Sequence, residues 1–390
     1  MFKFSSLQRV TNSGTFIPEI DGLRFLAILM VVFYHLDGFL MKELSFQDFE
    51  GLDNYKGLHR FLQNGYFGVE LFFAISAFVV TLPFANHYLN NKSPIRLKDF
   101  FFRRLTRIEP PYLISLLIIL GVHLFVLEGE KFSDYTPSFF YSLFYAHGFF
   151  YHRDFQPLVN NVTWSLEIEI QFYLLAPLLA YLLIKKNKFG LPLLIFLTIA
   201  FTSITKFPKP NFISLYEYFH YFLLGITIAY MRAEGIQWNF LERMNERFSQ
   251  TLISILCFFL MIFCDITFMG PLHTWFKLLF GNLQMVFMFV VFYNLLISRH
   301  TKIWINAPFF TVIGGMCYSI YLFHNHLIMS IGHFLLKVKL SQYFIVEYLI
   351  FGFILILCIV LVSLLFFILV ERPCMDKNWP IKLLKFFRIY

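Results

Sequence analysis

The residues with the clearest chemical potential stand in an apolar stretch near the N-terminus. Asp21, Arg24 and His35 follow one another at spacings of 3 and 11 residues. At about 100° per residue, these spacings place the three side chains on one stripe of a helix. His35 then lies about 16 Å from Arg24 along the helix axis, near the middle of a bilayer. A histidine at that depth can take the proton of a substrate hydroxyl.

The alternative interpretation of His35 is structural, because a histidine inside a membrane helix can simply hydrogen-bond a neighbouring helix. However, ionisable side chains in hydrocarbon are costly unless they are paired or face a cavity. Three such residues on one stripe therefore favour a functional role for His35.

Two later apolar stretches carry carboxylates. Glu70 is followed on its helical face by small residues, so helix packing and function both remain open for it. Glu169 and Tyr173 lie one turn apart on one face of a helix. Glu167 is expected nearer the external surface, where water can solvate it. Glu169 lies deeper and is therefore the better candidate.

A further apolar stretch contains Tyr321 and His324, which form an i, i+3 pair. His326 follows, but a His-x-His spacing on a helix points the two rings apart. Neither an H-E-x-x-H pair nor a C-x-x-C pair occurs, and the five cysteines have no regular spacing. We therefore expect no metal site and no disulfide framework.

Arg104 and Arg107 are spaced i, i+3 in a basic segment that precedes an apolar stretch. Lys and Arg beside a membrane span anchor it on the cytoplasmic side, which accounts for part of this charge. Guanidinium groups also bind phosphate oxygens through two parallel hydrogen bonds. The pair therefore predicts a site for a phosphate-bearing donor such as coenzyme A.

The composition indicates that a membrane surrounds these residues. Of 390 residues, 58% are hydrophobic and 14% are charged, whereas soluble domains have about half and a quarter. A run of about 20 apolar residues crosses the hydrocarbon core as a helix. The sequence therefore predicts an all-α, polytopic membrane bundle of about ten transmembrane helices. The predicted spans are residues 22–41, 66–86, 110–128, 164–184, 190–206, 212–231, 250–269, 275–298, 309–332 and 344–370.

Residues 137–151 are also apolar, but about 15 residues is short for a crossing. This segment is therefore interpreted as re-entrant or interfacial, with a full span as the alternative. No repeat, linker or second soluble domain is evident, so residues 1–390 are expected to form a single membrane domain.

The basic residues predict an orientation. The connection after the second predicted span is rich in Lys and Arg, whereas the connection after the first is mostly acidic. By the positive-inside rule, the N-terminal segment 1–18 and the C-terminal tail 371–390 are then cytoplasmic. The net charge of +8 comes from these inside segments, which form no continuous surface for nucleic acid.

These residues resemble the motifs of the acyltransferase family 3 membrane proteins, which O-acetylate bacterial surface glycans. The resemblance extends over nearly the whole chain and rests on motifs that occur in the family's order. They are Ile20-Asp21-Gly22-Leu23-Arg24 followed by His35; Gly68-Val69-Glu70-Leu71-Phe72-Phe73-Ala74-Ile75-Ser76; Arg104-Leu105-Thr106-Arg107; Thr163-Trp164-Ser165-Leu166 through Glu169 to Gln171-Phe172-Tyr173; Tyr318-Ser319-Ile320-Tyr321-Leu322-Phe323-His324; and Glu371-Arg372-Pro373.

The resemblance implies O-acetyl transfer from cytoplasmic acetyl-CoA, without a metal cofactor. The acceptor would be a hydroxyl of a surface polysaccharide, lipopolysaccharide or related glycan, in free or lipid-linked form, at the bacterial inner membrane. His35 would act as general base or as a covalent acyl carrier, tuned by Asp21 or Arg24, and Glu169 would orient the acceptor. Arg104 and Arg107 would bind the donor. Further pocket candidates are Glu70, Ser76, Trp164, Ser165, Tyr173, Tyr321 and His324.

The sequence departs from the family pattern at two positions. Ala77 stands where the family usually has glycine, and Glu70 replaces the commoner aspartate. No esterase-like domain with its own serine is expected after the last span, so the chain is similar to the family's stand-alone subgroup.

A different class of protein fits the same buried histidines and carboxylates. They could form the proton pathway of a proton-coupled membrane transporter. Its usual sequence signal, matched interrupted spans in two related halves, is not evident. Turnover of a thioester distinguishes the two classes. The sequence leaves open the acceptor sugar, the acyl chain beyond acetyl, and the oligomeric state.

Overall fold

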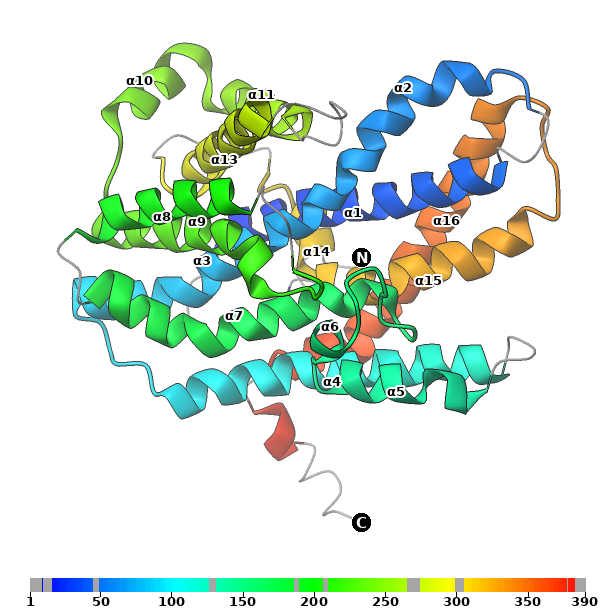
Figure 1. The fold of residues 1–390 in the computed structure, drawn as a ribbon, viewed down its shortest axis with the longest axis horizontal. Helices are drawn as coiled ribbons and strands as arrows, with labels where there is room; N and C mark the ends of the chain where they lie inside the picture. The colour runs from blue at the N-terminus through cyan, green and yellow to red at the C-terminus, as the bar shows by residue number, and fades with distance from the viewer. Residues whose placement is uncertain are drawn as a thin grey trace.

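The computed structural model describes residues 9, 16–44, 49–125, 131–185, 189–205, 210–264, 274–298, 305–376 and 378–382 (Figure 1). Within these ranges every regular element is a helix, and one isolated parallel bridge pairs Glu50 with Tyr343. A helix satisfies its backbone hydrogen bonds within its own segment, as a bilayer requires. The predicted all-α, polytopic membrane fold is therefore confirmed.

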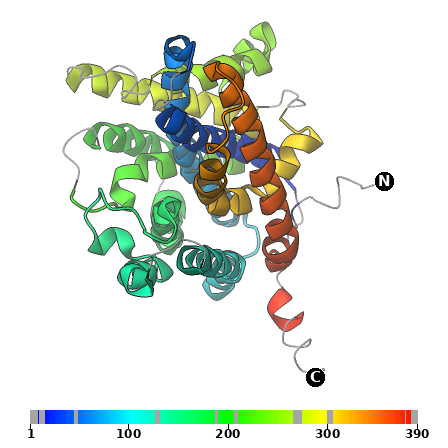
Figure 2. The same ribbon diagram turned by 90° about the vertical axis from the view of Figure 1, so that its right-hand side faces the viewer.

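The helices lie mostly along one common direction, and Figure 2 shows many of them end-on. They are α1 Pro18–Leu44, α2 Leu52–Gln63, η2 Asn64–Tyr66, α3 Phe67–Asn90, α4 Leu97–Phe125, α5 Phe132–Leu143, α6 His147–Phe150, η3 Asn161–Thr163, α7 Trp164–Ala180, η4 Tyr181–Lys185, α8 Gly190–Ile204, α9 Leu215–Glu234, α10 Asn239–Phe248, α11 Gln250–Phe263, α13 Thr274–Leu296, α14 Pro308–Gly315, α15 Cys317–Leu335, α16 Phe344–Phe366, η5 Phe367–Glu371 and α17 Arg372–Cys374. Helix α1 packs against α3, α14 and α15 at the centre of the bundle.

The predicted number of ten spans is not confirmed. Among the described helices, six are long and apolar enough to cross a membrane alone. A seventh results if α10 and α11, which meet at 106°, form one bent span. Helix α8 has only 15 residues, and α9 carries charged residues at both ends. Residues 1–8, 10–15, 377 and 383–390 of the predicted terminal segments lie outside the described residues. So do residues 126–128, 206 and 265–269 of the third, fifth and seventh predicted spans.

The third predicted span begins earlier than expected. The predicted start at residue 110 follows the basic segment, yet α4 runs continuously from Leu97 through Pro110 and Pro111, which lack backbone N–H groups. Proline at 110 removes the helical partner of the Thr106 carbonyl. The Trp379 indole N–H donates to that carbonyl at 3.0 Å instead. The basic segment is therefore helical, and Arg104 and Arg107 stand on the same helix as the apolar stretch.

The ninth predicted span, 309–332, is broken. Helix α14 ends at Gly315, and α15 starts anew at Cys317. Gly314 packs so closely on the Asp21 backbone that any side chain there would clash with it. The new helix start is stabilised by the Glu371 carboxylate, which accepts hydrogen bonds from the backbone N–H and the hydroxyl of Ser319.

The apolar segment 137–151 contains the end of α5, a turn and the short helix α6. Helix α5 has 12 residues, about 18 Å of helix, which is too short to cross the hydrocarbon core alone. Tyr112 of α4 donates a hydrogen bond to the Ser142 carbonyl at 2.9 Å, which ties α5 to α4. A full span by this segment is therefore wrong.

Close packing of α3 on α9 depends on Gly225. A methyl group there would lie 2.7 Å from Ala77 Cβ and 2.9 Å from the backbone nitrogen of Phe78. Small residues let membrane helices approach until their backbones touch. Nothing lies within 4 Å of the corresponding position at Gly121 of α4.

We predict that Gly225→Ala destabilises the protein by about 1–3 kcal/mol, because an extra methyl group overpacks the interface. The matched variant Gly121→Ala should leave stability unchanged or raise it slightly, since alanine favours helix. Thermal unfolding in detergent measures both. Equal melting temperatures for the two variants would contradict this account of the α3–α9 contact.

Candidate functional site

One fully buried carboxylate joins two arginines at the beginning of α1. Asp21 accepts from Arg24 Nη1 at 3.0 Å and from Arg9 Nε at 2.8 Å. Asp21 and Arg24, predicted to share one helical face, thus form an ion pair one turn apart. Arg9 was missed by the sequence analysis, because it precedes α1 and only the tertiary structure brings it to Asp21.

Two further arginines come from α4. Arg107 interacts electrostatically with Arg104 and with Arg9, and Arg9 with Arg24. We call Arg9, Arg24, Arg104 and Arg107 the basic centre. Its nearby carboxylates are Asp21, Glu169 and Glu371. Four positive charges facing three carboxylates leave an excess that suits an anionic ligand.

A polar cluster adjoins the basic centre. Glu169 Oε1 accepts from the Ser76 hydroxyl at 2.5 Å and from the Tyr173 hydroxyl. The Arg104 guanidinium carbon lies 5.3 Å from the centre of the Tyr173 ring and 3.8 Å from that of Phe100. The predicted proximity of Glu169 to Tyr173 is confirmed, and the fold adds Ser76 from α3 and Arg104 from α4.

Two imidazoles face each other deeper in the bundle. The ring centres of His35 on α1 and His324 on α15 are 5.1 Å apart. His324 Nδ1 lies 2.8 Å from the Tyr321 carbonyl and 3.1 Å from the Ile320 carbonyl, so it must carry the hydrogen. His324 Nε2 is then an acceptor, and it has no partner among the described residues. The pair can accept or pass on a proton.

A hydroxyl pair connects α7 with α15 beside these histidines. Tyr321 donates to the Val162 carbonyl, so Ser165 is the donor in the 2.7 Å contact between the two hydroxyls. The Tyr321 ring centre lies 5.8 Å from that of His324. Ser165 and Tyr321, both predicted pocket residues, are therefore brought together next to the histidine pair.

The remaining two candidates lie around a different aromatic residue. The Trp164 ring centre is 5.5 Å from that of Tyr218, and Glu70 interacts electrostatically with Tyr218. Glu70 is half-buried on α3, next to this aromatic pair. Its surroundings suit the packing interpretation as well as the functional one.

The prediction that Glu167 is solvated is wrong. Its side chain is buried, and its two oxygens accept the backbone N–H groups of His147 and Gly148 at 3.1 and 2.7 Å. The carboxylate therefore holds the connection between α5 and α7 in place.

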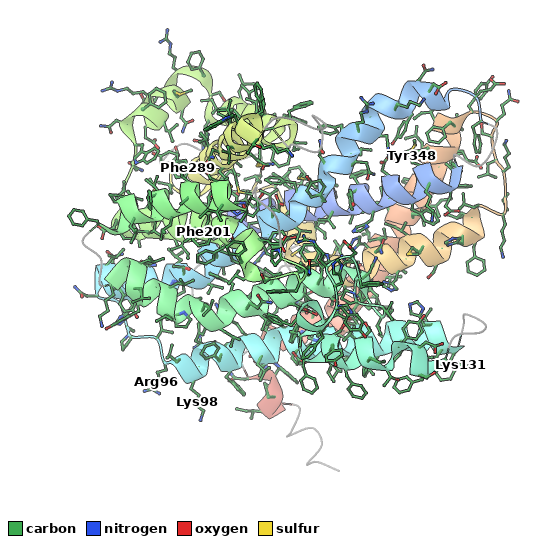
Figure 3. All side chains as sticks on the ribbon, in the orientation of Figure 1. Arg96, Lys98, Lys131, Phe201, Phe289 and Tyr348 are labelled. Carbon is green, nitrogen blue, oxygen red and sulfur yellow. The ribbon has the colours of Figure 1, made fainter. Side chains whose placement is uncertain are left out.

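Asp37 is a second buried carboxylate of α1 that the sequence analysis missed. It accepts hydrogen bonds from Tyr55, His59, Gln63 and Tyr348, the last of which is labelled in Figure 3. An aspartate inside a predicted span was the available signal, but Asp37 lies off the stripe of His35. These bonds fasten α1 to α2 and α16. Among the described residues, no three His, Cys, Asp or Glu side chains gather as metal ligands do.

Comparison with protein families shows to which family this chain belongs. A family model described as an acyltransferase domain matches residues 17–368. The chain belongs to this acyltransferase family. The match runs from α1 into η5, and it includes every predicted site residue from Asp21 to His324.

Among characterised and putative relatives, the acyltransferase chain is 31% identical over 194 residues to the peptidoglycan O-acetyltransferase OatA of Listeria monocytogenes. It is 28% identical over 188 residues to a putative O-acetyltransferase of Staphylococcus aureus. These matches cover 46% and 45% of this chain, and 27% of each relative. The matched part is thus about a quarter of each relative's length. No solved structure matches the chain.

We predict that Asp21→Asn destabilises the acyltransferase chain by about 3–5 kcal/mol, because it leaves two buried guanidinium groups without their counter-charge. Asp53→Asn is the matched control, since Asp53 is exposed and pairs with Lys56 on the surface. Thermal unfolding in detergent should show a large drop in melting temperature for the first variant alone. An unchanged melting temperature for Asp21→Asn would contradict the central role of this ion cluster.

Proposed function

We propose that the protein transfers an acetyl group from acetyl-CoA to a hydroxyl of a bacterial surface glycan. The observation that carries the proposal is the facing pair His35 and His324 in a chain of an acyltransferase family. His35 shares helix α1 with Arg24 of the basic centre. The family is defined by acyl transfer, which argues against the alternative function as a proton-coupled membrane transporter.

The donor is proposed to bind at the basic centre. Coenzyme A carries phosphates, and arginine forks bind phosphate oxygens with two parallel bonds. Because Arg104 and Arg107 stand near the basic start of α4, the positive-inside rule puts this end in the cytoplasm. Both termini are then cytoplasmic, and the protein lies in the inner membrane. The pantetheine arm extends from here toward the histidines.

His35 is proposed to take the proton of the acceptor hydroxyl while that oxygen attacks the thioester carbonyl. The carbon–sulfur bond breaks, and the thiolate of coenzyme A leaves and recovers a proton. Alternatively, an imidazole nitrogen accepts the acetyl group first and passes it to the hydroxyl. Asp21 and Arg24 act on His35 only through the fold of α1, so they are positioning residues. Glu169 lies in the polar cluster beside Arg104 and is proposed to relay a proton.

The acceptor is proposed to be a cell-surface glycan, reached from the opposite face of the membrane. One relative is named as an O-acetyltransferase of peptidoglycan. Polysaccharide and lipopolysaccharide hydroxyls have the same chemistry, and a lipid-linked precursor would present it at the membrane surface.

We predict that His35→Ala lowers acetyl transfer by about 100- to 10,000-fold, the usual contribution of a general base. The matched variant His333→Ala changes a histidine at the end of α15 that lies outside the site, and it should retain activity. The O-acetyl content of surface glycans, measured by NMR in cells with equal expression, decides the result. Full acetylation by His35→Ala would make His35 structural.

We predict that Arg104→Lys raises the KM for acetyl-CoA by about tenfold, because lysine keeps the charge and loses the planar fork. The matched variant Arg103→Lys changes an exposed neighbour and should keep the wild-type KM. Release of coenzyme A by protein in nanodiscs measures both. If the wild-type protein releases no coenzyme A from acetyl-CoA when acceptor is present, the transferase proposal fails.

A further inference from the structure

An aromatic pocket of about 490 Å³ lies where the end of α3, the start of α4 and the end of α7 meet. Its lining includes Phe84, His87, Tyr88, Phe101 and Tyr181. The volume falls in the usual range for small-molecule sites. Flat rings from three helices therefore surround a space large enough for a nucleoside.

Three basic residues lie beside this pocket. Lys185 Nζ lies 5.5 Å from the centre of the Tyr88 ring and 5.2 Å from that of Tyr181. Arg96 and Lys98 flank Leu97, another lining residue, and both are exposed (Figure 3). A ligand with a planar ring and phosphate groups would match both features.

The pocket shares one wall with the basic centre. Phe84 of the pocket packs edge-on against Phe100 at 5.1 Å between ring centres. The guanidinium of Arg104 lies over the same Phe100 ring. On α7, the lining residue Leu174 directly follows Tyr173, which belongs to the polar cluster. The pocket and Arg104 are therefore neighbours, separated by the ring of Phe100.

We propose that this pocket binds the adenine ring of the acetyl-CoA donor, with Lys185 next to the ribose 3′-phosphate; this inference rests on the proposed function. The adenine stacks on the tyrosine rings, and the diphosphate extends along Phe100 toward Arg104. A lipid acyl chain would fill the apolar part of the pocket, but it would leave the cations beside the pocket without a partner. The chemistry of the lining thus favours a nucleotide.

The test uses full-length protein in nanodiscs and compares acetyl-CoA with S-acetyl-4′-phosphopantetheine, a donor that lacks the nucleotide. Tyr181→Leu should raise the KM for acetyl-CoA about tenfold or more, because base stacking is lost, and leave kcat unchanged. The KM for the short donor should stay at the wild-type value. Tyr216→Leu, a change at an exposed tyrosine outside the pocket, is the matched control.

Lys185→Met tests the contact with the 3′-phosphate. It should raise the KM for acetyl-CoA and leave the KM for acetyl-3′-dephospho-CoA unchanged. If neither Tyr181→Leu nor Lys185→Met alters the KM for acetyl-CoA, the pocket is not the nucleotide site, and the proposed function still stands. If wild-type protein uses neither donor, the proposed function itself is wrong, and the inference falls with it.

A second measurement does not depend on any variant. Wild-type protein is irradiated with 8-azidoadenosine-CoA, and the labelled peptides are identified by mass spectrometry. Labels should fall on the segments around Tyr88 and Tyr181, and excess acetyl-CoA should prevent them. Labels confined to other segments, or labels displaced by added phospholipid and not by acetyl-CoA, would overturn the proposal.

Discussion

An ionised side chain inside a membrane bundle needs an opposite charge or hydrogen bonds, because hydrocarbon supplies neither. Asp21 meets this requirement with Arg9 and Arg24. Gly314 of α14 also packs directly against the Asp21 backbone. Arg9, α1 and α14 are thus joined at one residue. This junction sets the position of α1, and therefore the position of His35.

The same requirement explains where the helices of this bundle break. The start of α15 lies inside the bundle, where Glu371 supplies acceptors for Ser319. Pro110 and Pro111 are tolerated within α4 because the Trp379 indole N–H donates a hydrogen bond to the Thr106 carbonyl, which has lost its helical partner. With these partners in place, α15 can start at Cys317 and bring His324 opposite His35. The hydrogen bonds that satisfy the backbone at these positions therefore also help to position the histidine pair.

The polar residues form a series that suits an elongated donor. The aromatic pocket lies at one end, the basic centre and the cluster of Ser76, Glu169 and Tyr173 follow, and the histidine pair lies beyond them. Coenzyme A has this same order of parts, with a planar base, phosphates and then a long arm that ends in the thioester. The matching order of the sites and of the parts of coenzyme A supports both the proposed function and the proposed adenine site.

The sequence by itself determined what depends on short-range periodicity and composition. These are the all-α membrane class, the stripe of Asp21 and Arg24, and the turn that joins Glu169 to Tyr173. Only the tertiary structure decided that Arg9 pairs with Asp21, that Glu167 is buried, and that the ninth predicted span is broken. The reason is that lipid-facing and protein-facing side chains of membrane helices are equally apolar, so hydrophobic periodicity does not specify which helices pack together. Contacts between distant segments follow from that packing alone.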